Sequence, residues 1–314
     1  MFKEKSVTGF GPQGFQKNYP VRQAQYFKNH PDSPWSILAD DISSPFNECL
    51  KTGVEQGITG LFFVFGIFFM VFSNTISSPV LRATAAAIII FSCFSYPFDF
   101  FVFQVLGVFC LASIATTQKS NAIMNLTCSS LKNIAVKIPA ICLIAISCGI
   151  ILLSSRNYYI DVKNWNRTAY SFSPKSNQKI DELKALHPVF KNNAQFVFNY
   201  GSALYDAGRY QEAVILLEKT GKLFSGSETL LLLGDAYERT DTYTQALEVW
   251  ETASYIKPSL FMPHYKMAKL YDKMGDYERA KQKAGEVLKK EIKIDLPKID
   301  RIKKEMQKLY IRDY

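Results

Sequence analysis

An amide and two carboxylates stand directly before a long apolar run, and these residues are the best suited to do chemistry. Asn47 and Glu48 are followed by Glu55, and residues 58–72 are then almost entirely apolar. About 20 predominantly apolar residues are needed to cross the hydrocarbon core of a membrane, and this run approaches that length. We therefore expect polar side chains at a membrane edge, where they could orient a hydrophilic substrate.

The segment before this run interleaves aromatic and amide side chains with a single arginine, Arg22. Sugar rings suit such a mixture, because their apolar faces stack on aromatic rings while their hydroxyl groups exchange hydrogen bonds with amides. An aromatic belt that only anchors the chain at the membrane interface would explain the aromatic residues alone. The candidate substrate-binding residues are Tyr19, Gln23, Gln25, Tyr26 and Glu48.

Four apolar segments approach the length of a membrane span. They cover residues 57–74, 79–96, 98–116 and 134–154. Almost no loop separates the second segment from the third at Pro97, where proline interrupts a helix, so we expect a tight hairpin of two spans. One long kinked span with a re-entrant piece is the alternative.

Charge divides the chain into an apolar half and a charged half. The mean hydropathy of −0.03 and the net charge of +9 describe neither half, because most Lys, Arg, Asp and Glu residues follow residue 154. Arg82 and the loop 118–137 carry basic residues and no acid, which favours the cytoplasm for them and the outside for both soluble ends. Basic residues on the opposite side nearly balance this tally, so charge alone leaves the orientation open.

Neither a metal site nor a disulfide framework is predicted. No cysteine lies after residue 154, and His30, His187 and His264 are far apart in the sequence, so no spacing typical of metal ligands occurs. Residues 9–15 are rich in glycine but lack the Lys-Ser/Thr ending of a phosphate-binding loop. We expect no cofactor and no metal.

The second half of the chain contains an internal repeat. Gly201, Gly234 and Ala268 recur at intervals of 33 and 34 residues, and each is followed by an alanine twelve positions later. Small residues at fixed positions let paired helices pack closely. The pattern resembles the tetratricopeptide repeat, with Trp250 at a groove position usually occupied by a smaller aromatic residue.

Additional helices are expected at both ends of the array. A degenerate pair precedes it, with Trp165 and Ala169 on its first helix and residues 180–186 on its second, and a capping helix begins after Pro297. The excess of basic residues from Lys273 onward is interspersed with acids, as on a solvated helix face rather than a nucleic-acid site. We expect a protein or peptide ligand on the repeats, contact with membrane lipid, and no nucleic acid.

The order of these parts resembles the C-terminal part of the O-antigen ligase and polymerase superfamily in forms fused to tetratricopeptide repeats. The Gly-Phe-Gly turn at residues 9–11 and residues 19–27 resemble its upstream extracytoplasmic loop. Phe46 stands where the family has a histidine, Ser44 cannot replace a general base, and the family's N-terminal spans are absent, so we expect a truncated form. The positions that match the family motif are Asn47, Leu50, Glu55, Gly57, Gly60 and Leu61.

The resemblance implies glycan transfer from an undecaprenyl-diphosphate carrier to an unknown acceptor at the outer face of the cytoplasmic membrane. Arg22 is the candidate cation for the departing diphosphate, because a guanidinium group can bind phosphate oxygens through two bonds. Asn47 and Glu55 complete the implied catalytic set, and Glu48 or Glu55 would orient the acceptor. Asn47 could instead cap a helix, and Glu55 could be an interfacial charge.

We therefore expect an all-α protein in three parts: an extracytoplasmic loop region (1–56), four transmembrane helices (57–154) and a tetratricopeptide-repeat solenoid with a capping helix (155–314). The expected function is that of an O-antigen ligase-like glycosyltransferase in the inner membrane, with the repeats on the extracytoplasmic side. Whether the truncated form is active alone stays open. The alternative is a membrane-anchored repeat scaffold that binds proteins without catalysis.

Overall fold

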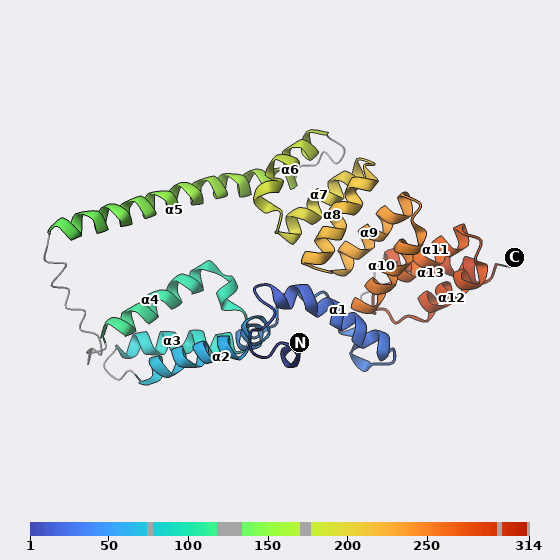
Figure 1. Cartoon of the computed structure of the whole chain (residues 1–314). Helices are drawn as coiled ribbons and strands as arrows, with labels where there is room; N and C mark the ends of the chain where they lie inside the picture. Colours follow the sequence, from blue (N-terminus) through green and yellow to red (C-terminus); the bar gives the residue numbers. More distant parts are fainter. Residues whose placement is uncertain (74–77, 118–133, 170–176, 294–296, 313–314) are drawn as a thin grey trace. The chain divides into compact units, whose positions relative to one another are not determined.

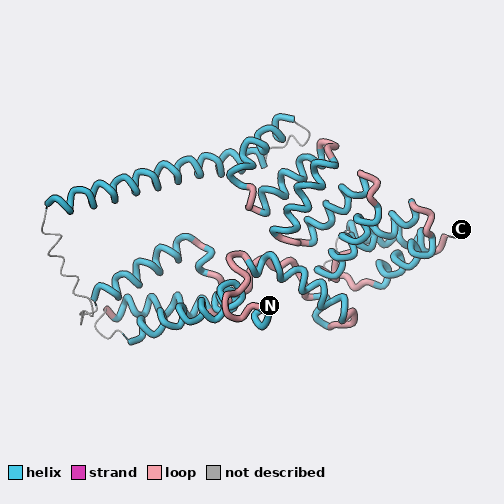
Figure 2. Tube along the Cα trace, viewed as in Figure 1, coloured by secondary structure: helices cyan, strands magenta, loops and turns pink. Residues whose placement is uncertain are grey.

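The computed structural model describes residues 1–73, 78–117, 134–169, 177–293 and 297–312. Every regular element within these ranges is helical, so the prediction of an all-α fold is confirmed (Figures 1 and 2). The chain divides into two compact units: Met1–Phe62 with Ser173–Tyr314, and Phe63–Phe172. The first unit therefore joins the N-terminal segment to the repeats, which the sequence had placed in separate domains.

The first unit contains the N-terminal helices and the repeat array. Its N-terminal elements are η1 (Phe2–Glu4), α1 (Gly14–Asn29), η2 (Pro34–Ile37) and the start of α2 (Glu48–Ser73). Its repeat helices are α6 (Asn177–Phe190), α7 (Ala194–Asp206), α8 (Tyr210–Leu223), α9 (Ser227–Arg239), α10 (Tyr243–Ile256), α11 (Met262–Lys273), α12 (Tyr277–Lys289) and α13 (Pro297–Tyr310).

Three antiparallel helix pairs form the array, and the recurring small residues lie where the two helices of a pair approach most closely. A Cβ atom placed on Gly201 would be 3.0 Å from Leu217 of α8, and one placed on Gly234 would be 2.2 Å from the indole Nε1 of Trp250. Trp250 is fully buried and donates a hydrogen bond of 3.1 Å to the carbonyl of Leu231. The large aromatic residue in the second pair therefore fits because its neighbour has no side chain.

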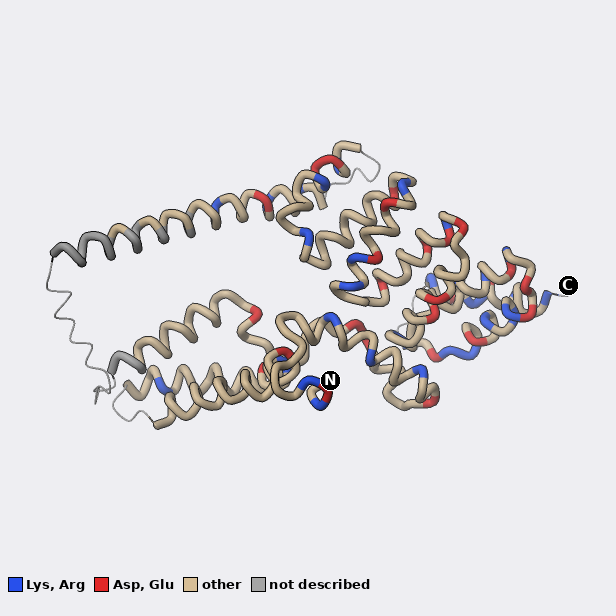
Figure 3. The backbone as a smooth tube through the Cα atoms, in the orientation of Figure 1, with Lys and Arg blue, Asp and Glu red and all other residues tan. Residues whose placement is uncertain are grey.

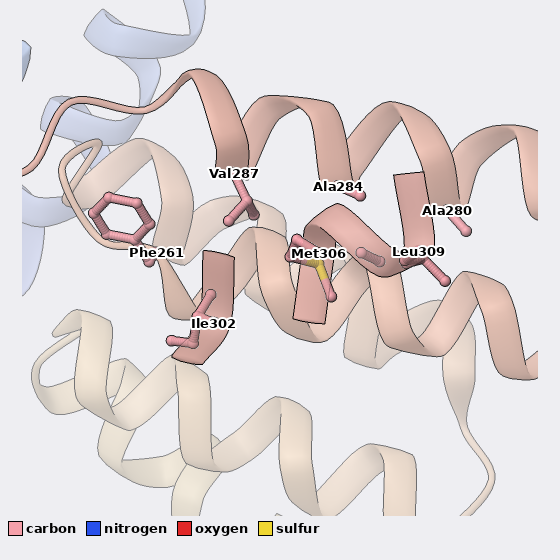
Figure 4. Close-up of a cluster of buried hydrophobic side chains, with 8 residues drawn as sticks. Phe261, Ala280, Ala284, Val287, Ile302, Met306 and Leu309 are labelled. Atoms are coloured by element: carbon pink, nitrogen blue, oxygen red, sulfur yellow. The ribbon is translucent and has the colours of Figure 1, made fainter. Parts of the chain in front are cut away.

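The third pair is closed by α13, as the sequence predicted for a capping helix. α11 and α12 contribute small residues, so the space between them is filled from outside by the apolar face of α13. Met306 of α13 is 2% exposed at the centre of this cluster. Its labelled members in Figure 4 are Phe261, Ala280, Ala284, Val287, Ile302, Met306 and Leu309.

The second unit holds the apolar end of α2 with α3 (Pro79–Ser92), η3 (Pro97–Asp99), α4 (Phe101–Thr117) and α5 (Ile134–Ala169). These helices are almost free of charged residues over their apolar parts (Figure 3). α3 and α4 contact each other directly, and both also contact η3 between them, as expected of a hairpin. A small buried cluster joins Val71, Ala85, Cys110 and Ile114.

Among the described residues, α2 alone is long and apolar enough to cross a membrane by length and composition. α3 and α4 are shorter apolar helices. Of the four predicted spans, only the first, in α2, is therefore supported among the described residues. Residues 118–133 of the predicted basic loop, with Lys119 and Lys132, lie outside the described residues.

Candidate functional site

The Gly-Phe-Gly turn and the apolar motif meet at a break in α2. Gly57 has φ +68° and ψ −158°, which no regular helix contains. In an unbroken helix the amide of Ile58 would donate to the carbonyl of Val54. Ile58 instead donates to the carbonyl of Ser6 at 2.7 Å, and the carbonyl of Val54 accepts from the amide of Phe10 at 2.9 Å.

The next helical bond is exchanged in the same way. The carbonyl of Glu55 accepts from the amide of Gly11 at 2.8 Å, and the amide of Thr59 points to the carbonyl of Val7 at 3.5 Å, with the Thr59 hydroxyl donating to the same carbonyl at 3.2 Å. We call this exchange between residues 6–11 and 54–59 the backbone interlock. It satisfies the backbone groups that the break releases, which would otherwise cost free energy.

Two glycines make the interlock possible. A Cβ atom on Gly9 would lie 2.3 Å from the backbone of Glu55, and one on Gly57 would lie 2.3 Å from the carbonyl oxygen of Val7. Both residues also have positive φ angles, where side chains are disfavoured. The glycine-rich turn thus serves close backbone packing, which the sequence pattern alone did not indicate.

Arg22 and Glu55, two of the three predicted catalytic residues, both adjoin this turn. The guanidinium of Arg22 lies 5.5 Å from the centre of the Phe10 ring, and it binds the carboxylate of Glu4 through two nitrogen atoms. That contact lowers the pKa of Glu4. Glu55 is joined to the turn through its backbone carbonyl. The arrangement presents one guanidinium beside a polar turn at the start of an apolar helix.

The third predicted catalytic residue, Asn47, lies where α2 begins. Its side-chain oxygen accepts a hydrogen bond of 2.9 Å from the amide of Leu50, which is the geometry of a helix N-cap. Asn47 precedes Glu55 by about 12 Å along the helix axis, at 1.5 Å per residue. The structure thus agrees with the capping role that the sequence offered as an alternative for Asn47.

The predicted substrate-binding residues have different environments. Gln23 is buried, and its Nε2 donates to the carbonyl of Ile256 at 2.6 Å and to that of Asp40 at 3.0 Å. Tyr19 stacks on Phe15 at 4.7 Å between ring centres, and burial raises the pKa of its hydroxyl. Gln23, one of the eight predicted site residues, thus binds the repeat helix α10 through its side chain.

The remaining predicted residues lie nearer the surface. Tyr26 is exposed and stacks on His30 at 4.6 Å between ring centres. Gln25 is also exposed, and Glu48 occupies the first turn of α2. Their exposure leaves Gln25 and Tyr26 accessible to a ligand.

The sequence did not single out the acidic pair that follows α1 as functional. Asp41 accepts hydrogen bonds from the backbone amide of Ser227, at 2.7 Å, and from its hydroxyl. Asp40 pairs with Lys257 and, at 3.8 Å, with Lys293. Burial alone would raise the pKa of Asp40, but these ammonium groups lower it on balance. The partners lie 186 or more residues away, so no local spacing could have identified them.

Two of the cavities in the first unit are lined in part by this acidic pair. One of about 320 Å³ is lined by residues that include Gln16, Asp41, Phe198, Phe224 and Glu228. The other, of about 290 Å³, is lined by Asp40, by the lysines 257, 293 and 298, and by apolar residues that include Phe261 and Ile299. None of the eight predicted site residues lines either cavity. No cluster of metal-ligating side chains occurs in the described ranges.

Stacked antiparallel helix pairs closed by an extra helix define the repeat array as an α-solenoid. A family model of the tetratricopeptide repeat matches residues 264–291, which fall on α11 and α12. The third pair is therefore a tetratricopeptide repeat, and the first two pairs have the same helical arrangement. No curated protein matches the chain significantly.

Proposed function

We propose that this protein is an O-antigen ligase-like membrane glycosyltransferase that acts on a glycan linked to undecaprenyl diphosphate. The supporting observation is the backbone interlock. It joins the glycine turn at residues 9–11 to the motif at residues 55–61, the two segments in which the sequence resembles that superfamily. The resemblance does not depend on this contact, so the two arguments are independent.

In the proposed reaction an acceptor hydroxyl attacks the anomeric carbon of the donor sugar, the bond from that carbon to the carrier diphosphate breaks, and the hydroxyl proton passes to the departing diphosphate. Arg22 binds the departing diphosphate in place of the Glu4 carboxylate, since a guanidinium group fits both anions with two hydrogen bonds. A cation that meets the developing negative charge lowers the barrier to departure of the diphosphate. Glu55 or Glu48 orients the acceptor, and Asn47 fixes the start of α2.

The membrane half is proposed to contain four spans, formed by α2, α3, α4 and the apolar part of α5. Large apolar side chains on α2 and α4 are exposed, among them Phe62, Phe69, Phe101 and Phe109. Contiguous exposed apolar surface of this kind is typical of a membrane or protein contact. We place the repeats on the extracytoplasmic side, next to the outer face of the inner membrane.

Variants at Arg22 and Glu4 test the proposed reaction in a glycan-transfer assay with an undecaprenyl-diphosphate-linked donor. Arg22→Ala is expected to lower the transfer rate by about 10²-fold to 10³-fold, the usual loss for one transition-state donor. Glu4→Gln breaks the same ion pair but keeps the guanidinium, so transfer should be retained. Equal losses of transfer in both variants would show that the ion pair has only a structural role. Unchanged transfer in Arg22→Ala would show that Arg22 is not the cation that binds the diphosphate. Lys17→Ala, an exposed change on α1, is the matched control.

The second candidate function is a scaffold, favoured by the tetratricopeptide match. Such repeats commonly bind proteins, and the first helices of successive pairs contact each other on one side of the array, α7 with α9 and α9 with α11. That side carries ion pairs, such as Lys266 with Asp235 at 2.6 Å and Lys273 with Glu238 at 3.7 Å. A scaffold predicts that Lys273→Glu reduces cross-linking to a partner in native membranes, whereas Arg22→Ala leaves that cross-linking unchanged.

A further inference from the structure

The N-terminal segment supplies caps to two neighbouring helices of the second repeat. α9 starts at Ser227, and its preceding residue, Gly226, has no side chain to bind the free amides of the first turn. The carboxylate of Asp41 accepts from the Ser227 amide and hydroxyl. An anion at a helix N-terminus is also favoured by the helix dipole.

The second cap lies at the same end of this antiparallel helix pair, where α10 ends. Ile256 is the last residue of α10, and its carbonyl has no partner within the helix. The buried amide of Gln23 donates to it at 2.6 Å. Lys257 follows at the C-cap and pairs with Asp40. The anion Asp41 thus lies at the start of α9, and the cation Lys257 of the repeat lies at the end of α10, where Asp40 pairs with it.

Apolar contact accompanies these polar bonds. Ala24 of α1 is buried in one cluster with Leu230, Ala253 and Ile256. Two alanines on facing helices leave room for the backbones of α1 and α10 to come close. Buried apolar residues that adjoin paired polar groups are typical of a specific interface.

We propose that the face formed by the start of α9 and the end of α10, here called the docking face, is a peptide-binding site of the repeats. Its ligand is the chain's own segment 23–41. The repeats then fix the membrane-adjacent segment that carries Arg22, and a foreign protein must bind a different face. The docking itself is independent of glycan transfer, and only its consequence for Arg22 rests on the proposed function.

Carbodiimide treatment of the full-length protein in detergent tests the docking directly. This reagent joins a carboxylate to an amine only when they are in contact, so a cross-linked peptide between Asp40 and Lys257 is expected by mass spectrometry. The contact of Glu238 with Lys273, at 3.7 Å within the repeats, serves as the internal positive control. Absence of the first cross-link in a sample that contains the second would overturn the proposal.

Hydrogen exchange of variants provides a second readout. Asp41→Asn and Gln23→Leu are each expected to increase amide exchange in residues 23–41 and at the start of α9 or the end of α10 by about fivefold to tenfold, the effect of one lost buried hydrogen bond. Asp41→Glu, which keeps the anion, should restore protection at α9. Asp32→Asn, on the exposed loop after α1, is the control.

Exchange in Asp41→Asn and Gln23→Leu that equals exchange in Asp32→Asn would contradict docking. Both measurements are made without a glycan donor. The docking proposal and the glycosyltransferase proposal can therefore fail separately.

Discussion

Gly57 is constrained twice, by its backbone angles and by the carbonyl of Val7. Gly57→Ala is expected to destabilise the interlock by about 1–3 kcal/mol from backbone strain alone, with a further cost from the contact at 2.3 Å. The measurement is hydrogen exchange at Phe10 and Gly11, whose amides depend on the break in α2. Gly66→Ala in the same helix meets no atom within 4 Å and should leave this exchange unchanged. Equal exchange in both variants would show that the interlock tolerates a side chain.

Glu286 is predicted to make stability depend on acid pH. Burial would raise its pKa, but hydrogen bonds from His264 and Lys283 outweigh burial and lower the pKa to about 2. Because the folded pKa lies below the unfolded value near 4.5, its contribution is complete above that value and is lost as the pH falls toward 2. Chemical unfolding between pH 6 and 2 should show this loss.

Glu286→Gln should flatten the pH dependence in that window, whereas Glu278→Gln, an exposed change on the same helix, should not. A stability slope that is unchanged in Glu286→Gln would mean that the carboxylate has the same proton affinity in the folded and unfolded chains. His264 acts in the same direction at higher pH. Burial lowers its pKa despite the nearby carboxylate, so charging it as the pH falls through 6.5 also destabilises the fold.

The roles of individual residues followed from the sequence only where they depend on near neighbours. Asn47 precedes a helix by its own local pattern, and a capping role was among the predicted possibilities. The side-chain amide of Gln23 was predicted to bind a sugar. Its partner is instead the carbonyl of Ile256, 233 positions away. A side chain whose environment comes from a distant segment cannot be assigned from local spacing.

At the level of helix pairs, Gly234 and Trp250 form a coupled contact. Gly234→Ala would place a methyl group 2.2 Å from the indole nitrogen, and overpacking of this kind costs about 1–3 kcal/mol. Trp250→Phe removes that nitrogen, so the double variant should be more stable than the sum of the two single changes predicts, by about 0.5–3 kcal/mol. Thermal or denaturant unfolding of all three variants measures the coupling.

Gly221→Ala is the control for this cycle, because its new methyl group meets no atom within 4 Å. Alanine is the better helix former by up to about 1 kcal/mol, so this variant should be neutral or more stable. Additive costs in the Gly234 and Trp250 cycle would mean that α9 moves away from α10 to accommodate the methyl group.

The positions of the small residues were predicted well in the repeats, whereas the edge of the apolar half was predicted less well. The repeat spacing placed the small residues of α7, α9 and α11 correctly. α5, in contrast, continues from residue 134 to residue 169, across the expected domain boundary at 154. No proline or glycine lies between residues 150 and 169, so nothing ends the helix where its hydropathy changes.

At the scale of the whole molecule, the exposed apolar surface of α2 predicts membrane association. Phe65→Lys places a charge in the middle of the apolar run of α2, where insertion is expected to cost about 2.5–3.5 kcal/mol more. The variant should shift from the membrane fraction to the soluble or aggregated fraction after alkaline extraction. Ile215→Lys, a change at an exposed position of α8, should leave the distribution unchanged. Identical fractionation of both variants would argue against α2 as a span.

A reporter fused after Tyr314 tests the placement of the repeats. Extracytoplasmic repeats predict activity of a periplasmic alkaline phosphatase fusion and no fluorescence from a cytoplasmic green fluorescent protein fusion. The reverse pattern would place the repeats in the cytoplasm and remove the proposed outer-face site. The same pair of reporters fused after Ala169, at the end of α5, supplies a comparison in which the repeats are missing.

The grouping of residues 1–62 with residues 173–314 was the least predictable property. Composition separates the polar N-terminal segment from the repeats by a long apolar stretch, which favours separate domains. Their association depends on helix ends that lack caps of their own and on a charged pair, Asp40 with Lys257. Such complementarity is visible only when both partners have been placed.

The residue pairs at the centre of the three helix pairs differ in size: glycine faces leucine in the first, glycine faces tryptophan in the second, and alanine faces alanine in the third. The helix pairs are therefore not interchangeable. A chimaera that exchanged α10 with α12 would bring an indole against Ala268 and leave a void beside Gly234, so one interface would be too full and the other hollow. Substitutions at these positions are therefore expected to be epistatic, with evolution or design changing them two at a time. The residues packed between the two helices of each pair therefore determine which first helix can pair with which second helix.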